Sequence, residues 1–121
     1  MIVEDDHMLN RVMTLQLQTA GHFVRSAKTG ANALRLIEER IPSVLILDVG
    51  LPDLTGREII DRLRQNPLTA SIPLIVHTTL DLSEEEKEQL CLGPSRFVTK
   101  ATAFSERLGE LVAEVLDETG Q

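Results

Sequence analysis

The hydrophobic positions of this chain follow two alternating spacings. Short continuous apolar runs are typical of strands buried on both faces. They alternate with segments in which apolar residues recur every three or four positions, as on one face of a helix. The apolar runs occupy residues 1–3, 22–27, 44–48, 74–78 and 96–100. This order predicts successive strand–helix units, with a parallel sheet covered by helices on both faces.

The helical segments carry both a periodic apolar stripe and recognisable end signals. The expected stripes are Leu9, Val12, Met13, Leu17 and Ala20; Leu34, Ile37 and Ile41; Ile59, Ile60 and Leu63; and Leu108, Leu111, Val112 and Val115. Gly21 follows the first stripe and Pro42 the second, and both residue types are common just past a helix end. Ser83 and Glu86 have the S-x-x-E spacing of a capping box, so we expect them to open the helix after the fourth strand.

Polar residues stand at the carboxyl ends of all but one of the predicted strands. They are Glu4, Asp5 and Asp6 after the first strand, Asp48 at the third, Thr78 and Thr79 at the fourth, and Lys100 at the fifth. In a doubly wound parallel sheet, sites form beyond the carboxyl ends of the strands, where the winding direction reverses. If strands one, three, four and five lie side by side, these groups share one pocket.

Such a pocket would hold several carboxylates, and their charge has to be balanced. Two like charges about 4 Å apart repel by roughly 4 kcal/mol at an effective dielectric constant of about 20. Oxygen ligands at partly open positions favour Mg²⁺, and Lys100 would add a second positive charge. In that setting the Asp48 carboxylate can attack phosphorus, while Mg²⁺ and Lys100 neutralise the transferring oxygens. Thr78 can then donate a hydrogen bond to the new phosphate.

Each of these residues also has a simpler structural interpretation. Asp48 and Asp6 could cap the turn or helix that follows them, and Lys100 could be a solvated surface lysine. The whole cluster favours the functional interpretation for Asp48 and Lys100, whereas Asp6 is expected to cap the first helix. His77 lies inside the fourth strand and is expected to be a partly buried, hydrogen-bonded ring.

Composition narrows the functional classes. The chain has 121 residues, which suits one domain, and a formal net charge of −7 with three Phe as its only aromatic residues. The chain therefore lacks the basic surface and the aromatic stacking groups of a nucleic-acid-binding domain, and no direct nucleic-acid contact is expected. No apolar run approaches the roughly 20 residues of a membrane span, and the single Cys91 cannot form an internal disulfide. We therefore expect one cytoplasmic domain, residues 1–121, without membrane association.

At this point the chain resembles a known family. Four segments match, in order, the receiver domains of two-component response regulators: IVEDD, LILDVGLPDLTG, IPLIVHTT and RFVTKA. The resemblance covers essentially the whole chain. It implies an α/β, flavodoxin-like, doubly wound (βα)5 fold whose five-stranded parallel sheet has the order 2-1-3-4-5.

The resemblance also implies a function, a phosphorylation-dependent signalling switch. The phosphoryl group would come from a phosphohistidine on a histidine kinase or a histidine phosphotransfer protein. Such a domain assists its own phosphorylation and dephosphorylation but is not a turnover enzyme on external substrates. Its output would reach a downstream protein domain through the face formed by the fourth helix, the fifth strand and the last helix.

By the same resemblance, the cluster residues divide between the metal, the phosphoryl group and the switch. The implied Mg²⁺ ligands are Glu4, Asp5, Asp48 and the backbone carbonyl of Gly50, with Asp5 the direct ligand of the acidic pair. The implied catalytic residues are Asp48 as phosphoacceptor, Thr78 and Lys100. The implied switch residues are Thr78 and Phe97.

The residue after Lys100 departs from the family, and two other functional classes stay open. Lys100 is followed by Ala101, where the family usually has Pro in a cis bond. A non-proline cis bond costs about 2.5–4 kcal/mol, so we expect a trans bond and a reshaped loop. The chain could be a degenerate receiver that acts only as a protein-interaction module. A haloacid-dehalogenase-like enzyme would instead need a D-x-D nucleophile after the first strand, which EDDHM lacks. The sequence could also be a piece of a hybrid kinase or larger regulator.

Overall fold

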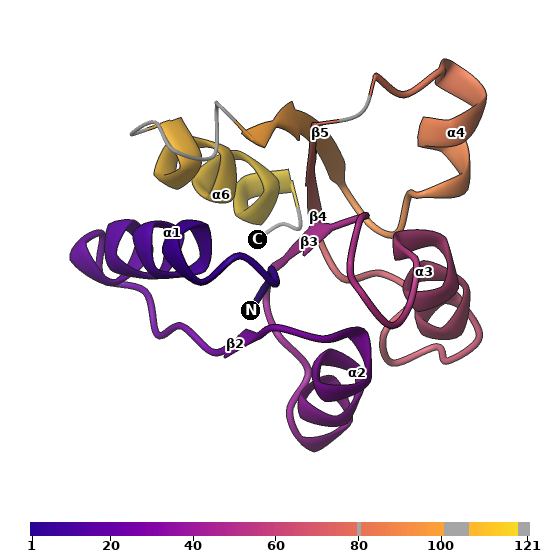
Figure 1. Cartoon of the computed structure of the whole chain (residues 1–121), viewed down its shortest axis with the longest axis horizontal. Coiled ribbons are helices and arrows are strands. Elements are labelled where there is room, and N and C mark those ends of the chain that lie inside the picture. The colour runs from indigo at the N-terminus through magenta and orange to yellow at the C-terminus, as the bar shows by residue number, and fades with distance from the viewer. Residues whose placement is uncertain (80, 101–106, 119–121) are drawn as a thin grey trace.

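The computed structural model describes residues 1–79, 81–100 and 107–118, and they form a doubly wound α/β fold (Figure 1). The elements, in chain order, are β1 Ile2–Val3, α1 His7–Thr19, β2 Ser26–Ala27, α2 Gly30–Glu39, β3 Leu45–Asp48, α3 Gly56–Arg64, β4 Leu74–Thr78, α4 Glu84–Gln89, β5 Ser95–Thr99 and α6 Arg107–Glu118. The strands pair in parallel, in the order β2-β1-β3-β4-β5. The predicted fold class and strand order are therefore confirmed.

The sheet is covered on both faces because successive side chains of a strand point to opposite sides. In β3, Leu45 and Leu47 belong to the hydrophobic core shared with α2 and α3, whereas Ile46 belongs to the core shared with α1 and α6. Figure 1 shows α1 and α6 side by side, with α2 and α3 on the other side of the sheet. This two-sided burial explains why the strands read as continuous apolar runs.

Two sequence predictions about element ends are wrong. The strand expected at 22–27 contains only Ser26 and Ala27, which pair with β1, and Phe23 is 83% exposed. The second helix ends at Glu39, so Ile41 lies outside it and is 43% exposed. Pro42 explains the second difference, because the residue before a proline is disfavoured in the helical conformation.

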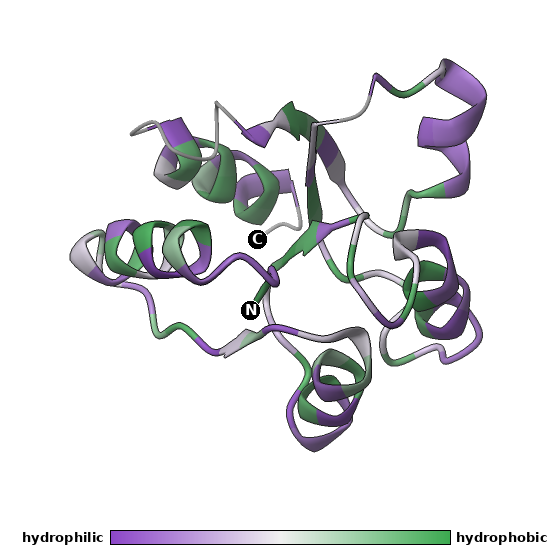
Figure 2. Ribbon diagram, in the orientation of Figure 1, coloured by the Kyte–Doolittle hydropathy of each residue, from purple (hydrophilic) through white to green (hydrophobic). Residues whose placement is uncertain are grey.

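Helix α4 is held differently from the others. Its capping box is confirmed, because the Glu86 N–H donates to Ser83 Oγ and the Ser83 N–H donates to the Glu86 carboxylate, each at 3.1 Å. All of its residues are described and none is buried, and the ribbon is largely hydrophilic (Figure 2). Arg64 of α3 donates to the backbone carbonyls of Glu88 and Cys91 at 3.1 and 2.6 Å. The helix itself therefore makes only polar contacts, and the nearest buried anchor is Leu90, directly after its last residue, which indicates low local stability.

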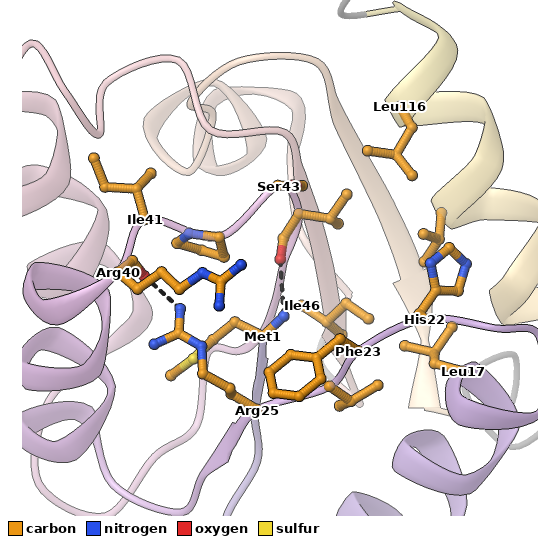
Figure 3. A pocket seen from close by; sticks show the side chains of 14 residues that line it. Met1, Leu17, His22, Phe23, Arg25, Arg40, Ile41, Ser43, Ile46 and Leu116 are labelled. Carbon is orange, nitrogen blue, oxygen red and sulfur yellow. Dashed lines mark hydrogen bonds between the residues drawn. The ribbon is translucent and has the colours of Figure 1, made fainter.

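A cavity of about 320 Å³ lies near the amino ends of β1 and β3 (Figure 3). Its lining includes Met1, just before β1, and Val44, just before β3. Arg25 in the same wall donates to the backbone carbonyl of Leu36 at 2.8 Å and to that of Arg40. The cavity is therefore at the opposite end of the strands from the predicted acidic cluster. None of the helices in the described ranges combines the length and the hydrophobicity that a membrane span requires.

Candidate functional site

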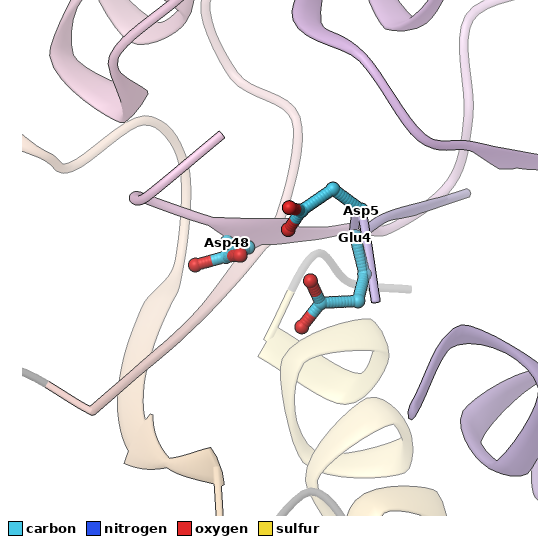
Figure 4. Close-up of side chains that lie close together, drawn as sticks. All are labelled: Glu4, Asp5 and Asp48. Carbon is cyan, nitrogen blue, oxygen red and sulfur yellow. The ribbon is translucent and has the colours of Figure 1, made fainter. Parts of the chain in front are cut away.

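Three carboxylates from two neighbouring strands converge at the carboxyl edge of the sheet. Glu4 and Asp5 directly follow β1, and Asp48 is the last residue of β3. The register pairs Val3 with Leu47, which brings the next residues, Glu4 and Asp48, alongside each other. One carboxylate oxygen from each of Glu4, Asp5 and Asp48 lies within 4.8 Å of the others (Figure 4). The acids that the sequence predicts to cluster are therefore brought together.

The cluster combines buried and exposed acids. Glu4 is 0% and Asp48 is 2% exposed, whereas Asp5 is exposed to solvent. The Gly50 N–H donates to Asp48 Oδ1 at 3.0 Å, and the Asp6 N–H donates to Glu4 Oε2 at 3.1 Å. The two hydrogen bonds each fix one oxygen of a buried carboxylate, and the exposed Asp5 leaves the cluster open to solvent on its own side.

Lys100 supplies the positive charge of the site. It follows β5, and its Nζ lies 3.1 Å from Glu4 Oε1 and 3.2 Å from Asp48 Oδ2. The second contact is also a hydrogen bond, donated by Lys100 to Asp48. The predicted convergence of Lys100 with the strand-end acids is thus present. The Lys100–Ala101 bond lies outside the described residues.

The acids differ in how readily they ionise. Burial raises the pKa of Glu4 from 4.5 to about 7, and the neighbouring Asp48 and Asp5 carboxyl groups add to the rise. Burial also disfavours the charged form of Asp48, but the Gly50 N–H, Glu4 and Lys100 together outweigh it. The pKa of Asp48 therefore lies below its usual 3.8. Burial likewise opposes the charge on Lys100, yet Glu4 and Asp48 raise its pKa above 10.5. Near neutral pH, Asp48 and Lys100 are charged and Glu4 is close to its midpoint.

The donor set fits a divalent cation. It consists of carboxylate oxygens, one of them exposed, as Mg²⁺ prefers when it keeps several of its waters. Within the described residues Glu4 Oε1 is buried, and its 3.1 Å ion pair with Lys100 Nζ lacks hydrogen-bond geometry, so this acceptor has spare capacity. A cation here would also favour ionised Glu4 and relieve the repulsion among the acids. The Gly50 carbonyl as a further ligand stays a prediction.

The remaining predicted site residues come from β4 and β5. Thr78 ends β4 and is 7% exposed; the register pairs Asp48 with His77, so Thr78 lies one residue further toward the carboxyl edge. Phe97 lies in the middle of β5, is partly buried against the α2–α3 side of the core, and its ring centroid is 6.0 Å from Lys87 Nζ. Their switching roles stay predictions.

The structure confirms the prediction for Asp6 and contradicts the prediction for His77. Asp6 caps α1, with the Leu9 N–H donating to Asp6 Oδ1 at 3.0 Å, as the capping interpretation predicts. The prediction for His77 is wrong, since its ring is fully buried and, within the described part of the chain, neither nitrogen has a hydrogen-bond partner. Its Nδ1 is 3.8 Å from Glu4 Oε1. Burial lowers the pKa of His77 to about 4, so it is neutral near pH 7 and adds no charge to the site.

Comparisons with known proteins agree with this geometry. A family model described as the response regulator receiver domain matches residues 1–113. The transcriptional regulatory protein KdpE of Mycobacterium tuberculosis is 36% identical over 119 residues, covering 98% of this chain and 51% of that protein. The transcriptional regulatory protein PhoP of Escherichia coli K12 is 32% identical over 120 residues, covering 99% and 53%. The chain therefore spans about half the length of these curated relatives.

Comparisons with solved structures also identify receiver domains. The receiver domain of the Francisella response regulator 1452 matches with a TM-score of 0.83 at 26% identity, covering 98% of this chain and 96% of that one. A CheY-like response regulator receiver domain protein from Methanospirillum hungatei also has a TM-score of 0.83 and 26% identity, with coverage of 97% and 91%. The chain belongs to the response regulator receiver domain family of two-component systems.

Proposed function

We propose that this chain is a phosphorylation-dependent switch in which the Asp48 carboxylate accepts a phosphoryl group with the help of Mg²⁺. Receiver domains of response regulators are signalling domains that interact with histidine kinases, not turnover enzymes. The observation that carries the proposal is an ionised carboxylate, Asp48, only 2% exposed and 3.2 Å from the Lys100 ammonium, with Glu4 and Asp5 beside it.

The donor that we propose is a phosphohistidine of a histidine kinase or a histidine phosphotransfer protein. One Asp48 oxygen attacks phosphorus, the P–N bond to the imidazole breaks, and its electron pair leaves with the imidazole, which takes up a proton. Both Asp48 oxygens are held before the reaction. The Gly50 N–H donates to Oδ1 at 3.0 Å, and Lys100 donates to Oδ2 at 3.2 Å. Positioning of this kind supplies much of the acceleration in phosphoryl transfer.

Charge balance decides which residues assist the transfer. Bound Mg²⁺, held by Glu4, Asp5, Asp48 and the Gly50 carbonyl, would neutralise part of the charge on the transferring oxygens. Lys100 exchanges its contact with Asp48 for one with the incoming phosphoryl oxygens, which keeps its charge paired. These roles rest on the convergence of the acids and of Lys100 around the end of β3.

The proposed output runs through the face formed by α4, β5 and α6 to a downstream protein domain. Thr78 would donate a hydrogen bond to the phosphoryl group, and Phe97 would change its orientation with it, shifting an existing equilibrium. The weak anchoring of α4 supports this choice, since elements that move in a switch come from the less stable parts of a fold.

The domain that we propose comprises residues 1–121 and acts in the cytoplasm without touching nucleic acid itself. Its net charge of −7 supports the last point. The relatives named as transcriptional regulatory proteins are about twice as long as the matched region. A nucleic-acid-binding activity would therefore belong to chain outside this domain.

Intact-mass spectrometry with phosphoramidate, whose P–N bond imitates the donor, tests the proposal. The wild-type chain should gain the mass of one phosphoryl group in Mg²⁺ and much less in EDTA, whereas Asp48→Asn should gain none. Asp61→Asn is the matched control, because Asp61 is a partly exposed acid of α3. A folded wild-type chain that gains no mass would instead support the degenerate interaction module.

A further inference from the structure

The loop between β3 and α3, residues 49–55, carries Gly50 next to the acidic cluster and is anchored at several points. Leu51 is 9% exposed and packs in the core with α2 and α3. The Gly56 N–H donates to the Val49 carbonyl at 3.2 Å, and Thr55 closes a capping box at the start of α3. The ends of the loop are therefore tied to β3 and α3, which leaves its middle to be placed by another contact.

Asp53 makes that contact, and it makes it to a different helix. Its Oδ1 accepts the Gly30 N–H at 2.8 Å, and its Oδ2 accepts the Ala31 N–H at 3.0 Å. Both N–H groups belong to the first turn of α2, where backbone donors have no partner inside the helix. These contacts also lower the pKa of Asp53 below its usual 3.8, so the carboxylate is ionised at neutral pH. A residue of the loop thus completes the cap of a helix 22 and 23 residues earlier in the chain.

Packing around this contact leaves the loop little freedom. A Cβ atom added at Gly30 would lie 2.8 Å from Leu54 Cβ, which is too close for two carbon atoms. Leu54 is partly buried against the same core. The loop therefore contacts the first turn of α2 through two consecutive residues, the charged Asp53 and the apolar Leu54.

The loop transmits this placement to the acidic cluster. Gly50 lies three residues before Asp53, and its N–H holds Asp48 Oδ1 at 3.0 Å. We infer that Asp53 is a positioning residue of the site: it fastens the 49–55 loop to α2, and so fixes Gly50 relative to the Asp48 carboxylate and the proposed metal. The inference rests on the proposed function, because it assigns Asp53 to the support of that same metal site.

The chain offers a matched control for the test. Thr29 also caps α2, with its Oγ1 accepting the Asn32 N–H at 3.2 Å, but it is not part of the loop. Asp53→Ala and Thr29→Ala each remove a cap from α2, and only Asp53→Ala releases the loop. A loss of Mg²⁺ affinity that comes only from weakening α2 would appear in both variants.

The experiment is an NMR titration with Mg²⁺ that follows the Gly50 amide in the full 121-residue chain. Asp53→Ala should weaken Mg²⁺ binding by about tenfold, the lower end of the effect of residues that support metal ligands. Its Gly50 amide should also exchange with solvent faster, with or without the metal. Thr29→Ala should leave both readouts unchanged. Asp53→Asn keeps one oxygen acceptor and should give an intermediate loss of affinity, which serves as the readout if Asp53→Ala is poorly folded.

Each outcome has a separate meaning. Unchanged Mg²⁺ affinity and Gly50 exchange in the folded Asp53 variants would overturn the inference and leave the proposed function intact. Equal losses in Asp53→Ala and Thr29→Ala would also overturn it, because the effect would then belong to α2. If the wild-type chain does not bind Mg²⁺ at all, the proposed function fails first and the inference fails with it.

Discussion

Replacing Glu4 with Gln should stabilise the metal-free protein above neutral pH and leave it almost unchanged in acid. Glu4 is fully buried, lies beside Asp48 and Asp5, and has a pKa raised to about 7 mainly by burial. Gln has nearly the shape of protonated Glu and cannot ionise. The variant therefore removes the cost of a buried negative charge with little change in packing volume, although it also removes the ion pair with Lys100 at 3.1 Å.

The sign and size of the effect follow from the pKa. A carboxyl group whose pKa is higher in the folded than in the unfolded chain binds its proton more tightly after folding. Its contribution to stability is fully present below pH 4.5, the unfolded value, and is lost as the pH rises through about 7. The rise of the pKa from 4.5 to about 7 corresponds to a folding free energy on the order of 3 kcal/mol above neutral pH.

His77 works in the opposite direction, so the wild-type pH profile alone does not isolate Glu4. Burial lowers its pKa from 6.5 to about 4, which means that folding disfavours the protonated ring. The stability that His77 contributes is full above pH 6.5 and lost as the pH falls toward 4. The two trends overlap and partly cancel, so the contribution of Glu4 is measured as the difference between Glu4→Gln and wild type at each pH.

Urea unfolding in EDTA, at about pH 5 and about pH 8.5, measures this difference. The variant should exceed wild type by roughly 3 kcal/mol at the higher pH and by much less at the lower one. Adding Mg²⁺ at about ten times its dissociation constant should stabilise wild type by about 1.4 kcal/mol. The variant should gain less, because it has lost a ligand. A variant that is less stable than wild type at the higher pH would refute the charge argument.

Three further changes test other parts of the account. Lys100→Ala removes the ammonium 3.2 Å from Asp48 Oδ2 and should slow phosphoryl uptake from phosphoramidate by about 100-fold, measured as an initial rate; an unchanged rate would contradict its role. Ser83→Ala should cost α4 about 1 kcal/mol and speed its hydrogen exchange, with little change in global urea stability because the helix buries no side chain of its own. Gly93→Ala places a Cβ about 2.3 Å from the Ser71 carbonyl oxygen and should lower the free energy of unfolding by about 2 kcal/mol or more, measured with urea.

Much of the fold could be predicted because its signals are local or follow general rules. The first three residues of β3 and of β4, LIL and LIV, are apolar, since their side chains are buried on both faces of the sheet. The rule that sites form at the carboxyl ends of parallel strands was enough to group Asp48 with Glu4 and Lys100. The S-x-x-E spacing at Ser83 likewise indicated where α4 begins.

The misses concern contacts that local sequence does not encode. Whether Phe23 joins a strand depends on pairing with β1, not on its own apolar character, and here it is exposed. The burial of His77 follows from its position in a central strand, and no nearby residue signals that both ring nitrogens are unpaired. The role of Asp53 has no local sequence signal, because its partners on α2 lie more than twenty positions away. The capping box of Thr55 and Glu58, by contrast, has the same spacing as that of α4 and could have been recognised.

Locating the phosphoryl group is the most direct test of the central claim. After reaction with phosphoramidate and Mg²⁺, borohydride converts an aspartyl phosphate to homoserine, and peptide mass spectrometry identifies the converted position. We predict conversion at Asp48, in amounts that fall sharply when Mg²⁺ is removed. Conversion at Asp5 or at another acid, with Asp48 left intact in a folded chain, would contradict the account.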